Sequence, residues 1–242
     1  MTNEFHAGPL LAISGPAAFE HGAIVEVQNS NNWTPLHEAT FHNHPDIIRL
    51  LLKHGATVNV RGKNRWTPLH EASCYGYLEP VQLLLEHGAD QEATNDILST
   101  PLHLAASRGQ LAAVRLLVEH KADVHAQNSN NWTPLHEATF HNLPNIIRLL
   151  LEHGATVKVR NKDDWTPLHE ASCYGYLDVL RLLLDNGADR NAANDVLSTP
   201  LHLAASRGQL AAVRLLVENG ANVHVQNREL TTLNVIVLLS IG

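Results

Sequence analysis

Apolar residues recur along the chain at helical spacing, in short stretches that end at a glycine or at a polar loop. Residues 45–54 form one such stretch, and Gly55 follows it. Its apolar side chains are Ile47, Ile48, Leu50, Leu51 and Leu52. Ahead of it, residues 35–42 place Leu36 and Ala39 on a shorter helical face. The pattern predicts two short helices with a chain reversal between them, each with one apolar face.

This pair of stretches is repeated at a constant interval. The tetrapeptide Thr-Pro-Leu-His occurs every 33 residues, starting at Thr34, Thr67, Thr100, Thr133, Thr166 and Thr199. A longer period overlies it, because residues 28–126 and 127–225 are identical at 78 of 99 positions without a gap. Three different repeats, A, B and C, are therefore duplicated as a block in the order ABCABC.

Helix-start and helix-end signals have the same positions in every unit. Thr34 suits an N-cap, and Pro35 suits the first helical position because its missing N–H has no partner to lose there. Asn43 and Gly55 suit the left-handed backbone that ends a helix. Helices of about ten residues are not stable alone in water, so each pair must bury its apolar face against neighbouring pairs. The sequence predicts an open, all-α solenoid.

The Thr-Pro-Leu-His motif, the segment Gly88-Ala89-Asp90 and the 33-residue period resemble the ankyrin repeat family over residues 29–226. The resemblance implies an ankyrin-repeat solenoid of helix-turn-helix units joined by β-hairpin-type fingers. It also implies a concave face of fingertips and first helices that binds proteins, and no catalysis. It gives a structural hydrogen-bonding role to the motif histidines, which are His37, His70, His103, His136, His169 and His202.

We expect one continuous array. Its units are a degenerate N-terminal half-repeat or cap at 1–28, full repeats at 29–61, 62–94, 95–127, 128–160, 161–193 and 194–226, and a truncated C-terminal repeat at 227–242.

Some positions depart from the family pattern. Two residues before the motif Thr the family usually has Gly, whereas Arg65, Leu98 and Leu197 occur here and would adopt a positive φ at a cost or change the turn. Lys121 replaces the Gly that closes the second helix in the other repeats, at a cost of roughly 1 kcal/mol if the backbone is still left-handed there. We expect this junction to be the weakest.

Composition excludes several classes of partner. The formal net charge is −7 and the basic residues are not clustered, so nucleic acid is not an expected ligand. The N-terminus lacks the basic region of a signal peptide, and no apolar run approaches the roughly 20 residues that span a bilayer. Cys74 and Cys173 lie at equivalent points of the duplication, too far apart for a disulfide. We expect an intracellular protein, cytoplasmic or nuclear, with no membrane partner.

The chain contains 17 histidines, yet no arrangement of them predicts a reaction or a metal site. His70 and Cys74, with their copies His169 and Cys173, have the i, i+4 spacing of two zinc ligands, but nothing completes a set of four. No nucleophile triad, phosphate-binding loop or paired carboxylates rise above the repeat pattern. We expect no enzymatic activity, no cofactor and no metal.

Large side chains recur on the expected concave face. All four tryptophans directly precede a motif Thr: Trp33, Trp66, Trp132 and Trp165. Such rings are favoured at binding hot spots, although each could instead lie across the adjacent finger and stiffen it. The first helices add a second set of expected binding residues, which are Phe41, His42, Tyr75, Arg108, Phe140, His141, Tyr174 and Arg207. With the glutamates that follow several motif histidines, the groove is expected to be aromatic and mildly acidic.

The sequence thus favours a non-enzymatic scaffold or adaptor that binds another protein. The two blocks offer equivalent surfaces, which suits a partner with two copies of one motif. An alternative is a targeting or substrate-recognition fragment of a larger enzyme whose catalytic domain is absent. The apolar tail over 233–241 could cap the array, mark a truncation or support self-association.

Overall fold

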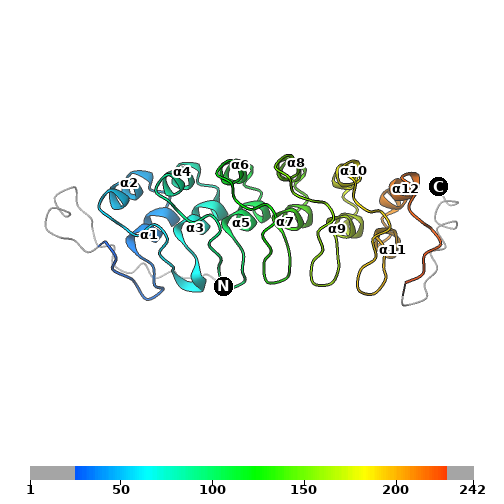
Figure 1. Ribbon diagram of the computed structural model, residues 1–242, viewed down its shortest axis with the longest axis horizontal. Helices are drawn as coiled ribbons and strands as arrows, with labels where there is room; N and C mark the ends of the chain where they lie inside the picture. The colour runs from blue at the N-terminus through cyan, green and yellow to red at the C-terminus, as the bar shows by residue number, and fades with distance from the viewer. Residues whose placement is uncertain (1–24, 228–242) are drawn as a thin grey trace, which may run out of the picture.

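The computed structural model describes residues 25–227 and confirms an all-α solenoid. The tail at 233–241 and most of the expected cap at 1–28 lie outside the described residues. Each unit contributes a first and a second helix, which form two parallel rows (Figure 1). The first helices are α1 (Pro35–Phe41), α3 (Pro68–Tyr75), α5 (Pro101–Ser107), α7 (Pro134–Phe140), α9 (Pro167–Tyr174) and α11 (Pro200–Ser206). The second helices are α2 (Pro45–Lys53), α4 (Leu78–Glu86), α6 (Leu111–Glu119), α8 (Pro144–Glu152), α10 (Leu177–Asp185) and α12 (Leu210–Glu218).

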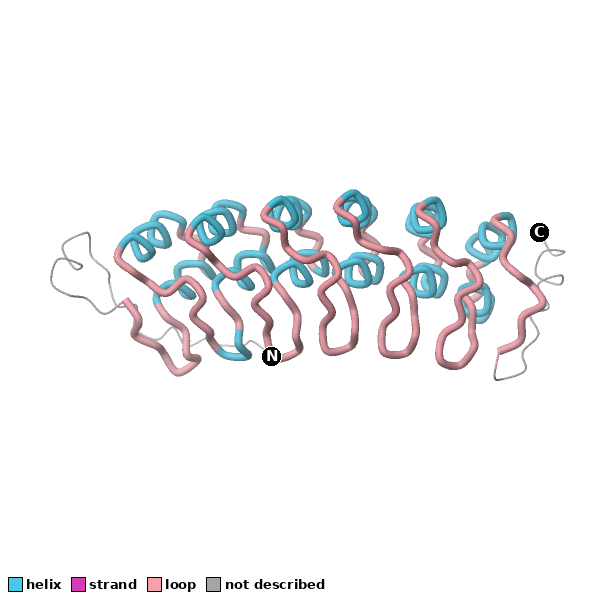
Figure 2. The backbone as a smooth tube through the Cα atoms, viewed as in Figure 1, coloured by secondary structure: helices cyan, strands magenta, loops and turns pink. Residues whose placement is uncertain are grey.

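Long loops descend from the second helices and return to the next first helix, as Figure 2 shows. We call these loops fingers 1 to 6, over residues 25–33, 56–66, 89–99, 122–132, 155–165 and 188–198. Within the described part of the chain the fingers contain no β-strand, and finger 2 alone carries a 3₁₀ turn, η2 (Lys63–Arg65). The fingers are therefore hairpin-like in path, without the regular ladder of a β-hairpin.

A finger asparagine shapes the tip in all fingers except finger 2. In finger 1, Asn29 Oδ1 accepts hydrogen bonds from the backbone N–H groups of Asn31 and Trp33, at 2.8 and 3.0 Å. The same two-bond turn recurs at Asn95, Asn128, Asn161 and Asn194. Gly62 has this place in finger 2 and cannot make those bonds. The local asparagine turn thus explains why five fingers share one shape.

Neighbouring tips are also joined by backbone hydrogen bonds. The N–H of Lys63 donates to Asn31 O at 2.9 Å, and the N–H of Asp96 donates to Asn64 O at 3.1 Å. Equivalent bonds continue from Ser129 to Ile97, from Lys162 to Asn130 and from Asp195 to Asp163. These bonds fix the spacing of the fingertips.

The core lies between the two rows of helices. First helices pack on first helices and second helices on second helices along the array, so each unit contacts its immediate neighbours. The motif leucines are among the most buried side chains of the first helices, at no more than 1% exposed: Leu36, Leu69, Leu102, Leu135, Leu168 and Leu201. Val81, Val114 and Leu180 make the equivalent contacts from the second row and are 0% exposed. The core is a continuous strip rather than a central cluster.

The residue two positions before each motif Thr has a left-handed backbone, even where Arg65, Leu98 or Leu197 replaces the usual Gly. φ is 59° at Arg65, 57° at Leu98 and 61° at Leu197, close to the 55° of Asp164. The turn therefore did not change; these side chains adopt a positive φ at an energetic cost. Finger 2 differs from the other fingers because two consecutive residues, Asn64 and Arg65, are left-handed there, with φ 58° and 59°. Both lie in η2.

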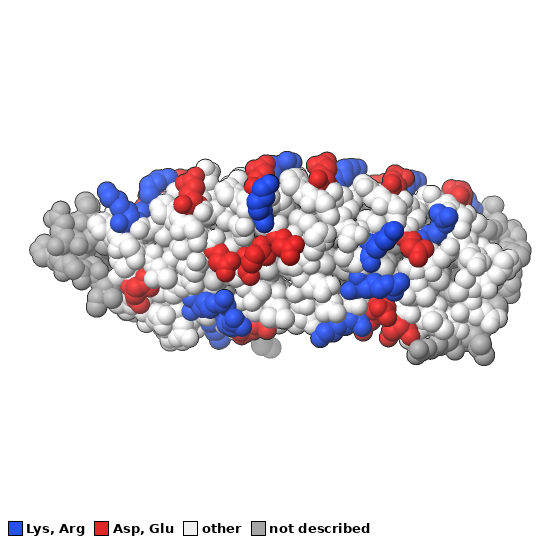
Figure 3. All heavy atoms as spheres, viewed as in Figure 1, with Lys and Arg blue, Asp and Glu red and all other residues white. Residues whose placement is uncertain are grey.

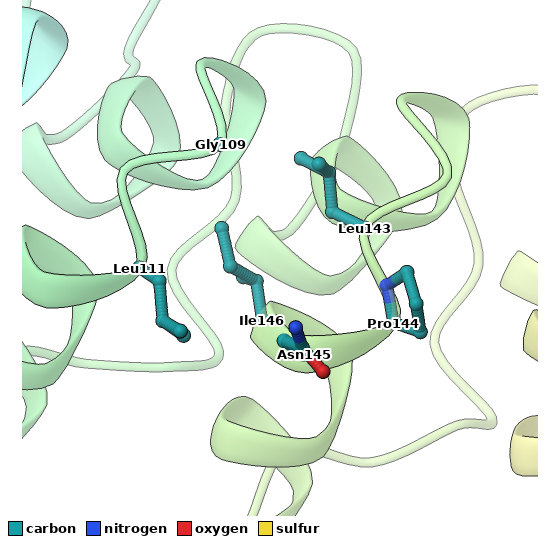
Figure 4. Close-up of a pocket in the computed structure, with 6 residues that line it drawn as sticks. All are labelled: Gly109, Leu111, Leu143, Pro144, Asn145 and Ile146. Carbon is teal, nitrogen blue, oxygen red and sulfur yellow. The ribbon is translucent and has the colours of Figure 1, made fainter.

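The junction between the two blocks has a contact that occurs once in the described array, because only there does a C unit meet an A unit. Leu143 packs against Gly109, with its Cδ2 3.5 Å from where a β-carbon on that glycine would lie. Its counterpart in the first block is the exposed His44. A shallow hollow of about 130 Å³ remains beside it, lined by Gly109, Leu111, Leu143, Pro144, Asn145 and Ile146 (Figure 4). Leu143 is apolar where it packs on the preceding C unit at Gly109. His44 has no such preceding unit among the described residues.

Lys121 follows the end of α6 at this junction and has a φ of 71°, so the left-handed backbone that the sequence left open is present here. A left-handed backbone strains a lysine and is free for a glycine. We predict that Lys121→Gly stabilises the array by about 1 kcal/mol, measured as an increased denaturant midpoint at unchanged slope. Gly220→Lys, at the equivalent position where φ is 78°, is the reverse control and should destabilise. No change in either variant would contradict the argument.

Candidate protein-binding face

The motif histidines connect each unit to the next. Thr67 N–H donates to His70 Nδ1 at 3.1 Å, so this ring nitrogen is an acceptor. The other nitrogen, Nε2, then carries the proton and donates to Ser99 O in the next finger, also at 3.1 Å. Equivalent bonds of 2.9 to 3.3 Å run from His37, His103, His136 and His169 to Trp66, Trp132, Trp165 and Ser198. These imidazoles position the finger residue that precedes the next motif, including three of the four tryptophans, Trp66, Trp132 and Trp165.

Burial keeps these imidazoles neutral. Desolvation lowers the pKa of His70, His103, His136 and His169 to about 4, and the accepting carbonyl groups offset part of that effect. The pKa of His37 is lowered by the same cause. A neutral ring with one donor and one acceptor fits both of its partners, so these histidines are committed to structure.

Aromatic rings form a continuous surface strip in the first block. Trp33 contacts Phe41 at 5.2 Å between ring centroids, Phe41 meets Tyr75 edge-on at 5.5 Å, and Tyr75 stacks on Tyr77 at 5.6 Å. The strip crosses from finger 1 over α1 to α3 and the turn after it. We call these four residues aromatic strip 1. Tyr75 is 45% exposed, so part of the strip faces outward.

The second block repeats the strip. Trp132 to Phe140, Phe140 to Tyr174 and Tyr174 to Tyr176 have ring-centroid distances of 5.4, 5.6 and 5.4 Å. We call these residues aromatic strip 2. Phe140 is 37% exposed and Tyr174 is 45% exposed. Tyr77 and Tyr176 are not among the binding residues expected from the sequence. The available signal was that each lies two residues from an exposed tyrosine, across a glycine.

The structure does not bring all the expected binding residues together. Among the ring contacts of the described residues, Trp66 and Trp165 meet only the motif histidine of their own unit, at 6.0 and 6.1 Å. His42 and His141 flank the strips, each edge-on to a phenylalanine at 5.1 Å. Arg108 and Arg207 are exposed residues at the ends of α5 and α11. The strips are therefore the compact part of the expected site.

The tryptophans are half-buried rather than exposed. Trp33 lies along its own His37 with a centroid distance of 6.0 Å and against the next finger, where a β-carbon on Gly62 would be 2.8 Å from its Cδ1. This ring therefore packs against a neighbouring finger while it remains at the end of the strip.

The first helices carry less negative charge than the sequence suggests. Glu71 and Glu170 are only 5% and 2% exposed, and Oε2 of Glu170 has no hydrogen-bond partner among the described residues. Burial raises the pKa of Glu71 and Glu137 to about 7, and burial together with the nearby Glu137 raises the pKa of Glu170 to about 9. At pH 7 Glu170 is neutral and the other two are part-ionised, so counting carboxylates overstates the negative charge.

Comparison with known families decides the classification. A model of ankyrin repeats, built as three copies, matches residues 11–95, 94–161 and 154–227. The chain belongs to the ankyrin repeat family. Ankyrin repeats are generally protein–protein interaction modules, and proteins made of them are typically not enzymes. No curated protein matches the sequence.

Other chemistry is sparse along the described ankyrin repeats. Cys74 and Cys173 are free and buried, and burial raises the pKa of the Cys74 thiol. No group of three or more His, Cys, Asp or Glu residues within 25–227 is placed to hold a metal ion. None of the helices described is long and apolar enough to cross a bilayer.

The protonation of the ankyrin-motif histidines is directly measurable. We predict that ¹⁵N–¹H spectra of the imidazoles show His70, His103, His136 and His169 as neutral Nε2–H tautomers at pH 7, with titration midpoints near 4. Since the unfolded value is 6.5, these groups favour folding fully above pH 6.5 and progressively less as the pH falls toward 4. Midpoints near 6.5 in the folded protein would refute the assignment.

The buried glutamates have the opposite pH dependence. Because the folded-state pKa of Glu170 is about 9 and its ordinary value is 4.5, its contribution to stability is lost as the pH rises between these values. We predict that the free energy of unfolding falls by about 2 kcal/mol between pH 7 and 9, and that Glu170→Gln removes most of this fall. The exposed Glu218→Gln serves as the control. Equal pH profiles for wild type and Glu170→Gln would show that Glu170 is ionised in the folded state.

Proposed function

We propose that the chain is a scaffold that binds a protein partner on the face formed by its first helices and fingers, with one binding surface on each aromatic strip. The main support is that each strip presents rigid aromatic rings at the surface, although the Leu and Ala positions of the same helices already fill the core. Large, partly exposed rings are well suited to bind a partner because they bury much area with few rotatable bonds.

The internal duplication gives independent support. The two blocks differ at 21 of 99 positions, and none of these lies in a first helix or at a tryptophan. The differences fall in the fingers, the second helices and the turns that flank the second helices.

Burial does not explain this distribution. Val81 in α4 is 0% exposed, yet it is replaced by Leu180 in α10. Tyr75 is 45% exposed and is unchanged as Tyr174. An exposed residue that is kept while a core residue changes favours a role in binding over a role in packing alone.

The array also sets the distance between the two surfaces. Neighbouring helices pack about 8–10 Å apart, so three repeats separate equivalent points by roughly 30 Å. A partner with two copies of one motif and a linker of that reach would bind both strips with avidity.

We therefore predict two sites of similar affinity for a ligand that carries a single motif, counted by titration calorimetry on the whole chain. Tyr75→Ala should remove one site and Tyr174→Ala the other, because each ring is the exposed centre of its strip. The double variant should bind nothing.

Leu78→Ala is the matched control, because Leu78 is also 45% exposed but begins the second helix α4. It should leave both sites intact, and circular dichroism should be unchanged in every variant. A single site in the wild type would end the two-site proposal, and full binding by the double variant would end the assignment to the strips.

A further inference from the structure

The tip of finger 2 and the tip of finger 5 carry different charges although they are copies of each other. Residues 61–65 contain Arg61, Lys63 and Arg65 and no acidic residue. Residues 160–164 contain Arg160 and Lys162 but also Asp163 and Asp164. The first tip therefore has a formal charge of +3 and the second of 0, on a chain whose net charge is −7. Figure 3 shows basic side chains at the tip of the finger with η2, and adjoining basic and acidic side chains at the tip of the finger before α9.

The basic groups of finger 2 have no carboxylate partner among the described residues. No Asp or Glu oxygen lies within 4.0 Å of the side-chain nitrogens of Arg61, Lys63 or Arg65, and all three residues are exposed. In finger 5, Arg160 Nη1 lies 4.0 Å from Asp164 Oδ1. Finger 2 thus presents unbalanced positive charge, whereas finger 5 balances its charge internally.

Other charges nearby do not cancel this difference. The tip of the following finger carries an aspartate in both blocks, at Asp96 and Asp195. The base of that finger is more acidic in the first block, because Glu92 and Gln91 stand where the second block has Asn191 and Arg190. Glu92 accepts the N–H of Asp123 and Arg190 donates to Gly220 O, so these side chains lie at the base of the finger and not at its tip. Lys158 replaces Asn59, but Asn59 bonds to Gly88 O and to the N–H of Asp90 beside the end of α4, which places this position at the base of the finger. The contrast at the tips therefore comes from Asn64 and Arg65 against Asp163 and Asp164.

The basic tip adjoins aromatic strip 1. Trp33, the last ring of the strip, lies so close to Gly62 that a β-carbon there would be 2.8 Å from Trp33 Cδ1, and Lys63 follows directly. The N–H of Lys63 is bonded to Asn31 O in finger 1, which holds the tip beside the strip. A bound segment that covers strip 1 and extends past Trp33 therefore reaches the three positive charges of this tip, a local exception to the scattered basic residues of the rest of the chain.

We propose that the first block selects partner segments that carry an acidic residue beside their apolar motif, whereas the second block accepts the same apolar motif without that residue. The inference rests on the proposed binding face. The two aromatic strips are identical in sequence, so both blocks prefer the same apolar motif. The tips of fingers 2 and 5 differ in charge, so the two blocks differ in the charge that they prefer beside that motif. Because the fingertip charges are exposed, the preference should be local and weakened by salt.

The test is selection of a displayed random-peptide library on the full chain and on two exchange variants. Asn64→Asp/Arg65→Asp gives finger 2 the tip charges of finger 5, and Asp163→Asn/Asp164→Arg does the reverse. At positions 65 and 164 each exchange places a residue in a backbone conformation that the same residue type already has in the other block, because Arg65 and Asp164 are both left-handed, with φ 59° and 55°. Circular dichroism checks that the variants fold.

On the wild type we expect two groups of peptides that share an apolar motif, one of them enriched in Asp or Glu at a fixed offset. Asn64→Asp/Arg65→Asp should abolish the acidic group, and Asp163→Asn/Asp164→Arg should make both groups acidic. A selected acidic peptide should bind the wild-type first block about tenfold more tightly than the exchanged one at low salt, as measured by fluorescence anisotropy, since three exposed charges are involved.

The two proposals fail in different ways. If selected peptides lose binding with Tyr75→Ala and Tyr174→Ala but their acidic content is the same on all three proteins, the charge proposal is wrong and the binding face stands. If no selected peptide depends on those tyrosines, the binding face itself is wrong and the charge proposal falls with it.

Discussion

The imidazole of the motif histidine is the contact on which the array depends. Its Nδ1 accepts the N–H of the threonine in its own unit and its Nε2–H donates to a carbonyl of the next finger, so one side chain fixes both a helix start and the position of the next unit. The bond that Nδ1 accepts requires the neutral ring, and burial favours that form by lowering the pKa of His70 to about 4. The regular spacing of the fingers follows from this bond and from the backbone bonds between tips.

Because that framework repeats, the residues that do not serve it stand out. The motif positions Thr, Leu and His are buried in every described unit, and the asparagines shape the fingers. Phe140 and Tyr174 lie on the same first helices but belong neither to the buried motif positions nor to the asparagine turns of the fingers. The division also holds for charge: Glu170 is buried and neutral, whereas Arg65 is exposed and unbalanced by any nearby carboxylate of the described chain.

The sequence predicted the fold almost completely, because the period, the prolines and the helix-closing residues are local signals. The helix α1 ends one residue before the expected His42, and Lys121, whose backbone conformation the sequence left open, is left-handed. The candidate aromatic strips were predicted in part. The spacing identified Phe41 and Tyr75, but ring contacts across units decide which rings meet, so Tyr77 was missed and Trp66 lies outside strip 1. The protonation of Glu170 depends on how deeply neighbouring helices bury it, which no local pattern records.

The block junction limits how such an array can grow. Contacts of A with B and of B with C are copied ready-made when a block is duplicated, but the meeting of C with A is new each time. Here the new joint has Leu143 where the first block has His44. Recombination that added a third block after α12 would again place an A unit against a C unit. Selection would then favour an apolar residue at the position equivalent to Leu143, even before the longer chain acquired a new partner. Each duplication therefore requires adaptation at one new interface between a C unit and an A unit. The rest of the copied sequence can be inherited unchanged.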